Sequence, residues 1–330
     1  MSREFDFIGD VHGRGHCLER LLRKLGYRRT RGVWRHPIKT AIFTGDLIDR
    51  GSQQFETVDI VRRMCLDGAA HCIMGNHEYN AIGWVTPDPT RPGQFRRAHD
   101  DHNLRQHAAF LQQAETAPLR YRDIIDWFRT LPILLEIGQV RVAHACWDER
   151  HAPAIKAACR PDGSLSERGL IESLTPGTEL HAACDAVVKG PRVRLPGGST
   201  YVDYLGERRH EVRIAWWRPT LTVHGCALPL PGIGFDAVPD GPLEPASVPA
   251  ISNEHLHFFG HYWMKGRPRV LRRNIACVDY YDGDDRQLTA YRWEGEQLLD
   301  DSRFVQALDP DKPAQTVPAC RHVAAGACIQ

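Results

Sequence analysis

Residues 43–51, FTGDLIDRG, place two carboxylates and a guanidinium at the end of an apolar run. The run Ala41-Ile42-Phe43 has the character of a buried strand, and it leads within a few residues into Asp46, Asp49 and Arg50. Burying such charges is costly unless each is paired with an opposite charge or binds a metal ion. The stretch therefore predicts a site that holds ions. The alternative is a solvated surface loop with one salt bridge.

Chemically similar residues follow four other short apolar runs. A lone buried histidine is more often a hydrogen-bonded core residue than a ligand, so none of these positions identifies a site by itself. Together they would collect on one edge of a sheet, and carboxylate, imidazole and amide ligands suit Mn, Fe or Zn. Two ions about 3.5–4 Å apart need a bridging ligand, and the carboxylate of Asp46 has two oxygens. The residues at the four other strand ends are Asp10 and His12, Asn76 and His77, His144, and His261.

The spacing of apolar residues predicts the elements that position this site. Strands are expected over residues 5–8, 40–44 and 70–74, and helices with one apolar face over 17–27 and 55–68. Strand, polar motif and helix in this repeated order are typical of βαβ units with a largely parallel sheet. Open α/β sheets bind their ligands at the carboxyl ends of the strands, where each motif falls.

The later part of the chain is less regular. It predicts a helix over residues 121–131 and strands over 140–143 and 256–259. Two further strand-like runs, 275–281 and 288–299, are separated by the charged turn DGDD, which predicts an antiparallel hairpin.

We expect one α/β domain over residues 1–305, because the motif strands extend from residue 5 to residue 261. Insertions into it are expected at about 84–130 and 150–250, and we expect them to decide the substrate. Residues 306–330 have the composition of a C-terminal tail.

The composition is that of an ordinary globular enzyme. The formal net charge of +1 over 330 residues gives no overall field that favours extended nucleic acid or an acidic membrane. Without an apolar run long enough to cross a bilayer, or a signal-peptide core, we expect a cytoplasmic protein. Its ten cysteines form no CxxC pair and are expected to be free thiols rather than zinc ligands. The sequence does not indicate the oligomeric state.

The motifs in residues 9–14, 45–51 and 75–78, a single strand-end histidine at 144, and GH at 260–261 resemble the calcineurin-type metallophosphoesterases. They are similar to those of PPP-type Ser/Thr protein phosphatases and bacterial symmetrical diadenosine tetraphosphatases. The resemblance implies an αββα sandwich of two mixed β-sheets flanked by helices, the metallo-dependent phosphatase fold. It also implies two divalent metal ions, for which we favour Mn and leave Fe and Zn open.

The same resemblance implies a role for each motif residue. A water or hydroxide between the ions attacks phosphorus, and His77 protonates the leaving oxygen. Asp49 orients His77, while Arg50 binds the phosphate oxygens that do not react. Asn76 is expected to contact both a metal and the phosphate. The implied ligands are Asp10, His12 and Asp46 for the first metal, with Asp46 bridging to the second, and Asn76, His144 and His261 for the second metal.

PPP enzymes use a second phosphate-binding arginine between their fourth and fifth motifs. We favour Arg213, which alternates with Val212 and Ile214 and so is expected to point inward from a strand. The alternative is a solvated basic face, to which the other candidates would also belong: Lys189, Arg192, Arg194 and Arg218.

The sequence departs from the superfamily pattern at two places. Many relatives have a glycine directly after the histidine of the fourth motif, whereas here Ala145, Cys146 and Trp147 follow His144. We expect Cys146 to be a packed thiol, with a thiolate near the metals as the alternative. Trp263 stands where many members have a second histidine, which leaves the first metal with three protein ligands and water.

Two other features remain open. The stretch HDDHNLRQH, residues 99–107, predicts an exposed helix, with a third metal site as the alternative. Trp216 and Trp217 are expected to be core residues rather than platforms for a nucleobase.

The leading functional prediction is a metal-dependent phosphatase for phosphomonoesters, either phosphoproteins or small phosphorylated metabolites. A hydrolase of dinucleoside polyphosphates, such as diadenosine tetraphosphate, is the alternative enzyme. A catalytically silent binding scaffold is the alternative of another class. The intact His77, Asp49 and Arg50 argue against the scaffold, which has no need of an acid for a leaving group.

Overall fold

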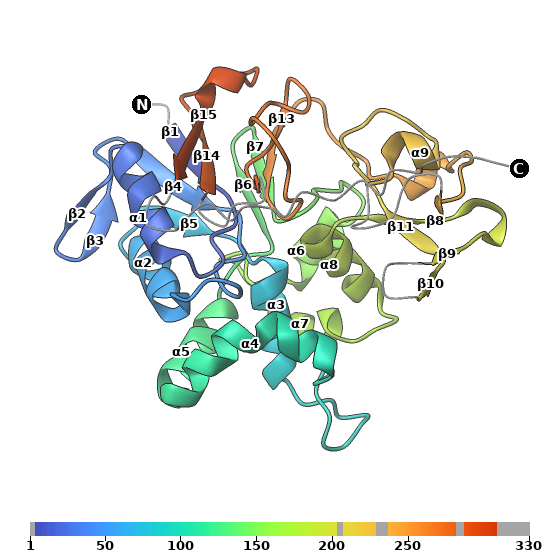
Figure 1. Ribbon diagram of the computed structural model, residues 1–330, viewed down its shortest axis with the longest axis horizontal. Helices are drawn as coiled ribbons and strands as arrows, with labels where there is room; N and C mark the ends of the chain where they lie inside the picture. Colours follow the sequence, from blue (N-terminus) through green and yellow to red (C-terminus); the bar gives the residue numbers. More distant parts are fainter. Residues whose placement is uncertain (1–3, 203–206, 229–236, 282–286, 309–330) are drawn as a thin grey trace, which may run out of the picture.

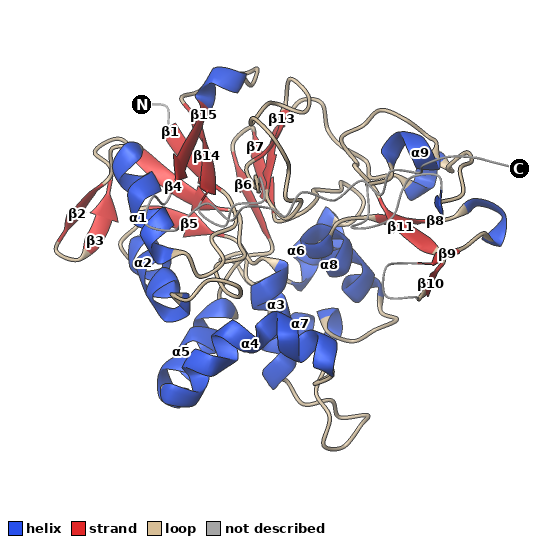
Figure 2. Cartoon of the chain, viewed as in Figure 1, coloured by secondary structure: helices blue, strands red, loops and turns tan. Residues whose placement is uncertain are grey.

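Two mixed β-sheets pack face to face at the centre of the molecule (Figures 1 and 2). The computed structural model describes residues 4–202, 207–228, 237–281 and 287–308. The first sheet has the strand order β15-β14-β1-β4-β5, in which β1, β4 and β5 are parallel and β14 is antiparallel to β1. Its strands are β1 (Glu4–Ile8), β4 (Lys39–Phe43), β5 (Ala70–Cys72), β14 (Gln287–Trp293) and β15 (Phe304–Leu308).

The second sheet has the order β13-β12-β7-β6. Strand β12 is parallel to both β7 and β13, and β6 is antiparallel to β7. The strands are β6 (Leu134–Ile137), β7 (Val140–Ala143), β12 (Leu256–Phe259) and β13 (Ile275–Cys277).

Aromatic side chains join the two sheets. The rings of Phe7 and Phe258 stack with their centroids 3.6 Å apart, within a buried cluster that includes Ile42 and Val142. Because successive strand residues point to opposite faces, Phe259 packs on the other side of the second sheet. This alternation buries both faces of the sheet and fixes its register.

Helices cover the outer face of the first sheet and the lower part of the molecule in Figure 1. Helix α1 (Gly15–Lys24) and helix α2 (Gln54–Leu66) place their apolar faces against this sheet, with Leu18, Leu21 and Val58 in one buried cluster with Phe43. The remaining helices of that part are α3 (Asn76–Val85), α4 (Asp101–Thr116), α5 (Pro118–Phe128), α6 (Ala152–Ala158), α7 (Glu167–Ser173) and α8 (Glu179–Lys189).

Short ribbons complete the described part of the chain. A cluster that contains Trp216, Val193 and Val212 packs against Phe259 on the outer face of the second sheet. The short elements are β2 (Arg28–Thr30), β3 (Val33–Arg35), β8 (Arg192–Arg194), β9 (Tyr201–Val202), β10 (Arg208–Arg209), β11 (Glu211–Arg213), α9 (Val223–Cys226), and 3-10 turns at Pro196–Gly198, Pro245–Ser247 and Asp301–Arg303.

The structure confirms the predicted fold and corrects two details. The predicted strands at 140–143 and 256–259 have those bounds, and the other predicted strands and helices of the two sheets are present with ends shifted by a few residues. The predicted hairpin is wrong: β13 pairs with β12 in the second sheet, whereas β14 pairs with β1 and β15 in the first. Apolar periodicity identifies a strand but not its partner, and the DGDD turn lies outside the described residues.

The predicted tail also begins too early. Residues 304–308 form β15, which pairs with β14, so residues 306–308 belong to the first sheet. In the described part of the chain, no helix combines the length and the apolar character needed to cross a bilayer.

Candidate functional site

The five motifs follow β1, β4 and β5 of the first sheet and β7 and β12 of the second, and they meet at the carboxyl ends of these strands. Their loops hold non-glycine residues in the left-handed backbone region, where strain is tolerated only if the surrounding structure enforces it. Such residues cluster at functional sites, and here they coincide with the predicted ones. Their φ values are 49° for His12, 53° for Asp46, 69° for Asp49, 71° for Arg50 and 73° for His261.

Asp46 lies at the centre of the site. Its Oδ2 is 3.3 Å from His144 Nε2, 3.7 Å from His77 Nε2 and 3.8 Å from His12 Nε2. These side chains form two possible metal-holding groups, one of Asp46 with His12 and His77 and one of Asp46 with His144 and His261. Since Asp46 belongs to both groups, its position is that expected of a bridging ligand.

The main chain fixes the tautomers of two of these histidines. His12 Nδ1 donates to the carbonyl of Ile48 at 2.8 Å, and His144 Nδ1 donates to the carbonyl of Thr44 at 2.6 Å. A carbonyl can only accept, so each ring carries a proton on Nδ1 and turns its Nε2 towards Asp46. A histidine that ligates a metal is commonly oriented in this way.

The second group is completed by an amide. Asn76 Oδ1 lies 2.7 Å from His261 Nδ1 and 3.1 Å from His144 Nε2. Within the described residues, the buried Nε2 atoms of His12 and His261 have no hydrogen-bond partner. The Nε2 of His12, buried without a partner 3.8 Å from Asp46 Oδ2, fits a metal ion, which would satisfy it.

Asp10 lies close to the two groups, and its carboxylate oxygens make other contacts. Its Oδ2 accepts the main-chain N–H of His261 at 2.9 Å, and its Oδ1 faces Thr44 Oγ1 at 3.4 Å. It falls outside both of the groups described above, one of which contains His77 instead. Its role as a ligand therefore stays a prediction.

Burial keeps two of the histidines neutral. It lowers the pKa of His12 well below its usual value, and the nearby Arg50 acts in the same direction. It likewise lowers the pKa of His261, with a further contribution from Arg213. Neutral imidazole is the form that binds a metal.

The carboxylates of the site attract positive charge. Burial opposes protonation of His144, but Asp46 and Asp10 outweigh it and raise the pKa of His144 to about 10. Burial would raise the pKa of Asp46, yet His144 and His77 hold it well below its usual value. Burial raises the pKa of Asp10. Divalent cations would meet the same demand for positive charge directly.

The structure brings His77 and Asp49 together as predicted. His77 Nδ1 lies 2.5 Å from Asp49 Oδ2, and the main-chain N–H of His77 donates to Asp46 Oδ1 at 2.9 Å. Burial disfavours the charged form of His77, but Asp46 and Asp49 outweigh this and raise its pKa. The Nε2 of His77 consequently faces Asp46, while Asp49 holds Nδ1.

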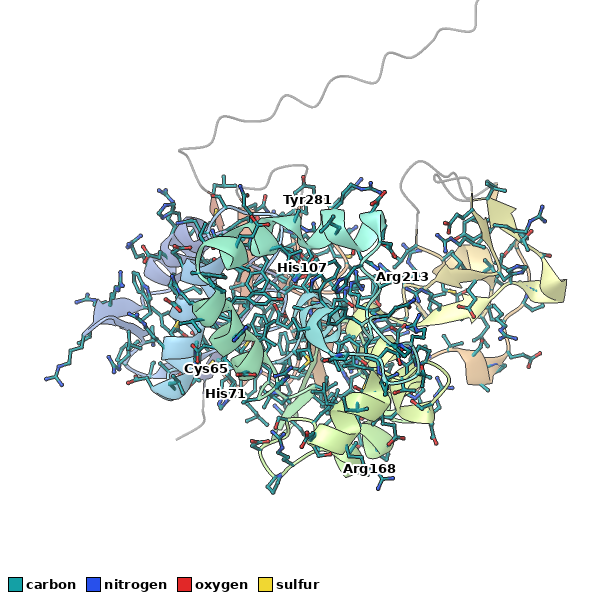
Figure 3. All side chains as sticks on the ribbon, turned by 90° about the horizontal axis from the view of Figure 1, so that it is seen from below. Cys65, His71, His107, Arg168, Arg213 and Tyr281 are labelled. Carbon is teal, nitrogen blue, oxygen red and sulfur yellow. The ribbon has the colours of Figure 1, made fainter. Side chains whose placement is uncertain are left out.

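Sequence reasoning missed His107. Residues 101–116 are helical, but the face of α4 that carries His107 is buried and only 4% of this residue is exposed. Its Nδ1 lies 2.9 Å from Asp49 Oδ1 (His107 is labelled in Figure 3). The expectation of an exposed helix is therefore wrong for this face. The one available signal was the spacing of His107 and Phe110, which places both on the same side of a helix.

Sequence reasoning also gave no role to Glu78 of the GNHE motif. Glu78 is fully buried and accepts main-chain N–H groups from Asp46 and Leu47, each at 2.8 Å, and from Gly75 at 3.0 Å. Burial, with Asp46 nearby, raises its pKa to about 7. Glu78 thus ties the loop after β4 to the loop after β5 and fixes the position of Asp46.

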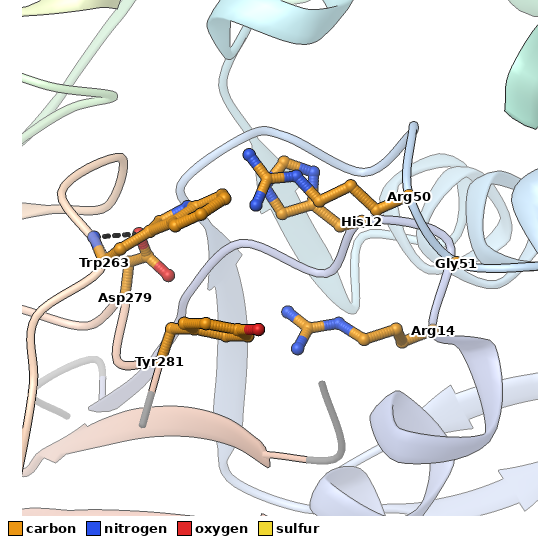
Figure 4. A pocket seen from close by; sticks show the side chains of 7 residues that line it. All are labelled: His12, Arg14, Arg50, Gly51, Trp263, Asp279 and Tyr281. Atoms are coloured by element: carbon orange, nitrogen blue, oxygen red, sulfur yellow. Dashed lines mark hydrogen bonds between the residues drawn. The ribbon is translucent and has the colours of Figure 1, made fainter. Parts of the chain in front are cut away.

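A small pocket opens beside His12, between two arginines and two aromatic rings (Figure 4). The guanidinium of Arg50 lies over the ring of Trp263, 3.4 Å from its centroid. Asp279 Oδ2 accepts the main-chain N–H of Trp263 at 2.8 Å and lines the same pocket. Arg14 faces Tyr281 across it (Figure 4). The sequence gave no indication of Arg14, Asp279 or Tyr281.

Arg213 is half-buried on β11, and its charge acts on His261. It lies at one side of a hollow lined by Arg192, Arg194 and further basic residues. Lys189 and Arg192 instead pair with Asp185, and Arg218 is exposed. Arg213 therefore remains the best-placed candidate, and its contact with phosphate stays a prediction.

The remaining open features are packed in the core. Burial raises the pKa of Cys146 well above its usual value, so it is a thiol, as expected. Trp216 and Trp217 are buried, and Trp216 Nε1 donates to the carbonyl of Ala145 at 2.9 Å. They are core residues and offer no face to a nucleobase. Eight of the ten cysteines lie among the described residues, all as free thiols.

Residues 4–154 match the family of calcineurin-like phosphoesterases. This part of the chain is a calcineurin-like metallophosphoesterase domain, which belongs to a class of metal-dependent hydrolases. Enzymes of this family use two metal ions, in agreement with the two groups around Asp46.

The chain is similar to PrpE, an asymmetrical bis(5'-nucleosyl)-tetraphosphatase. It is 43% identical to PrpE of Halalkalibacterium halodurans over 75 residues, which cover 22% of this chain and 30% of that protein. It is 29% identical to PrpE of Bacillus subtilis over 150 residues, which cover 43% of this chain and 57% of that protein. The matches thus span between 30% and 57% of the length of these relatives.

Among solved structures, the chain is similar to a protein serine/threonine phosphatase from Saccharomyces cerevisiae. The TM-score is 0.48 at 13% identity, with 94% of this chain and 81% of that chain covered.

Proposed function

We propose that the protein is a dinuclear metal phosphatase that hydrolyses phosphomonoesters, with Mn as the preferred ion and the cytoplasm as its location. The free thiols support the location. We also propose that the chain up to residue 308, where β15 ends, acts with its insertions as one catalytic domain.

The observation that carries this proposal is the set of imidazole nitrogens directed at Asp46. His12 and His144 present Nε2 to the same carboxylate oxygen, and the Nε2 of His12 has no partner among the described residues. A protein that only binds partners gains nothing from burying such atoms, because an unsatisfied polar atom costs stability. Bound divalent ions would activate water as the nucleophile and neutralise the charge of the phosphoryl group.

The side chains around the ions supply the other steps. Arg50 binds phosphoryl oxygens through its planar fork, and Arg213 is proposed as a second contact. As the bond from phosphorus to the leaving oxygen breaks, that oxygen takes the proton from His77 Nε2. Asp49 holds His77 through its Nδ1, at 2.5 Å, so that Nε2 faces the leaving group.

A hydrolase of dinucleoside polyphosphates is the second candidate. It is favoured by the pocket beside His12, where Arg14 and Arg50 would contact additional phosphates and Trp263 would contact a base. In the described conformation, however, the opening has a volume of only about 30 Å³. A base would enter only after Arg50 and Trp263 separate.

The test is a substrate panel on protein stripped of metal and supplied with one defined ion at a time. A phosphopeptide, an alkyl phosphate, p-nitrophenyl phosphate and diadenosine tetraphosphate would be compared by product analysis. We expect turnover of the monoesters with Mn and none after chelation. Exclusive cleavage of diadenosine tetraphosphate would replace the first candidate by the second. Full activity in stripped protein would contradict both, and absence of any turnover would favour the scaffold.

A further inference from the structure

We propose that His107 is a positioning residue that holds the carboxylate of Asp49 in the orientation in which it supports His77. The inference rests on the proposed function, in which His77 protonates the leaving oxygen. It adds a third member to the pair that the sequence predicts, and this member comes from helix α4.

Both carboxylate oxygens of Asp49 are occupied by imidazoles. Oδ2 lies 2.5 Å from His77 Nδ1, and Oδ1 lies 2.9 Å from His107 Nδ1. The main-chain N–H of Asp49 donates to Gln54 Oε1 at 2.6 Å, and Asp49 has a φ of 69°. An ionised carboxylate accepts hydrogen bonds only, so both imidazoles donate to it. The hydrogen bonds from His107 and His77 outweigh burial and lower the pKa of Asp49.

Aromatic packing fixes the ring of His107. It lies 5.3 Å from the ring of Phe110 and 5.7 Å from that of Trp84, measured between centroids. Its Nε2 is buried and finds no hydrogen-bond partner in the part of the chain that the structure describes. The ring of His107 therefore makes one hydrogen bond among the described residues, which Nδ1 donates to Asp49 Oδ1.

Helix α4 is attached to the same motif loop at a second point. Gln113 Oε1 accepts the main-chain N–H of Phe55 at 3.0 Å, and its side-chain amide donates to the carbonyl of Ser52 at 2.5 Å. The helix therefore contacts the loop on both sides of Gly51. This second attachment means that the helix stays docked when His107 is changed, so its hydrogen bond can be tested separately.

The consequence for the proposed reaction is geometric. His107 contacts the oxygen of Asp49 that His77 does not, and it belongs to neither of the two metal-holding groups. Without it, Oδ1 of Asp49 becomes a buried acceptor without a donor, and the carboxylate is free to rotate about its terminal torsion. His77 then loses its fixed orientation, and proton donation becomes less efficient.

Three variants separate this role from simple packing. His107→Phe keeps a ring but removes the donor, whereas His107→Asn places an amide N–H where Nδ1 lies. His102→Phe makes the same exchange at an exposed position of α4 and serves as the control. For His107→Phe we expect kcat on an alkyl phosphate to fall by about tenfold to a hundredfold, as is typical when an orienting side chain is lost, with little change in KM. The fall should be smaller for p-nitrophenyl phosphate, which needs less protonation, and Asn should restore most of the rate.

A second measurement does not depend on activity. In protein labelled with ¹⁵N-histidine, the two Nδ1 protons bound to Asp49 should resonate far downfield. His107→Phe should remove one signal and shift the other, and His102→Phe should leave both in place. If the wild type shows both signals but hydrolyses none of the substrates, the proposed function fails while the hydrogen-bonded chain stands. Equal losses for Phe and Asn, or an unchanged His77 signal in His107→Phe, would overturn the positioning role.

Discussion

The guanidinium of Arg50 rests on the indole of Trp263, 3.4 Å from the ring centroid. Arg50 comes from the loop after β4 and Trp263 from the loop after β12, so the contact joins the two sheets. Trp263 occupies the position where many members of the superfamily have a second histidine. The described arrangement replaces a possible metal ligand with a support for the arginine that is proposed to bind phosphate.

This contact predicts a role for Trp263 in substrate binding. In Trp263→Ala, Arg50 loses the ring that orients it, and KM for a phosphomonoester should rise by about tenfold, which corresponds to about 1.4 kcal/mol and lies within the range of cation–π pairs. Trp263→Phe keeps a ring, so its KM should lie between those of the wild type and Trp263→Ala. Steady-state kinetics at saturating metal would measure this. A fall in kcat with unchanged KM would show instead that Trp263 acts on the chemical step.

Asp46→Asn should empty both metal sites. The amide has nearly the same shape as the carboxylate, and its oxygen can still accept the N–H of His77, but it lacks the charge that holds two cations together. Elemental analysis after dialysis should find little metal in the variant and two ions per chain in the wild type. Metal content near that of the wild type would refute the bridging role.

His77→Asn should retain both ions and lose much of the rate. The position of His77 Nε2, 3.7 Å from Asp46 Oδ2, is compatible with either an acid or a ligand, so the variant decides between them. As an acid, His77 should contribute on the order of 10²–10⁴-fold, with the larger loss for an alkyl leaving group than for p-nitrophenol. Loss of metal would make His77 a ligand, and equal losses for both substrates would assign it to positioning the phosphate.

His257 should make the protein less stable in acid. Burial lowers its pKa to about 4, and its Nε2 donates to the carbonyl of Ser252 at 3.0 Å. The unfolded chain has an ordinary histidine pKa of about 6.5, so between these two values the unfolded state binds more protons. The stability that depends on neutral His257 is therefore present above pH 6.5 and is lost as the pH falls towards 4.

His257→Gln should remove this dependence. The difference in unfolding free energy between pH 7 and pH 5 should be smaller than in the wild type by about 2 kcal/mol. Urea unfolding at the two pH values would measure it, with His102→Gln as the exposed control. A difference unchanged by His257→Gln would mean that other groups cause the loss in acid.

The sequence predicts the residues of this site better than their arrangement. Asp46, His144 and His261 could be identified because each follows an apolar strand, and strand ends in such sheets meet at one edge. The pairing of β13 and β14 could not be identified, because an apolar run does not reveal which sheet it joins. His107 was missed for a related reason: its contact with Asp49 spans 58 residues, and on a mostly polar helix its spacing to Phe110 is only a weak sign of burial.

Glu78 is also a residue whose contacts could not be predicted from the sequence. It lies within a recognised motif, but its three main-chain partners come from two different loops, and only the folded structure brings them together. Local patterns indicate which side chains are available, whereas long-range pairing decides what they contact.

The stacked rings of Phe7 and Phe258 lie between the two sheets, and the strands that carry them lead into the loops of the candidate site. Asp46 belongs to the first sheet, while His144 and His261 extend from the second. Any ion held by all three binds the folded chain and not the unfolded one, so its affinity adds directly to the free energy that keeps the two sheets together. Bound ions would therefore stabilise the packing of the two sheets as well as serve the proposed chemistry.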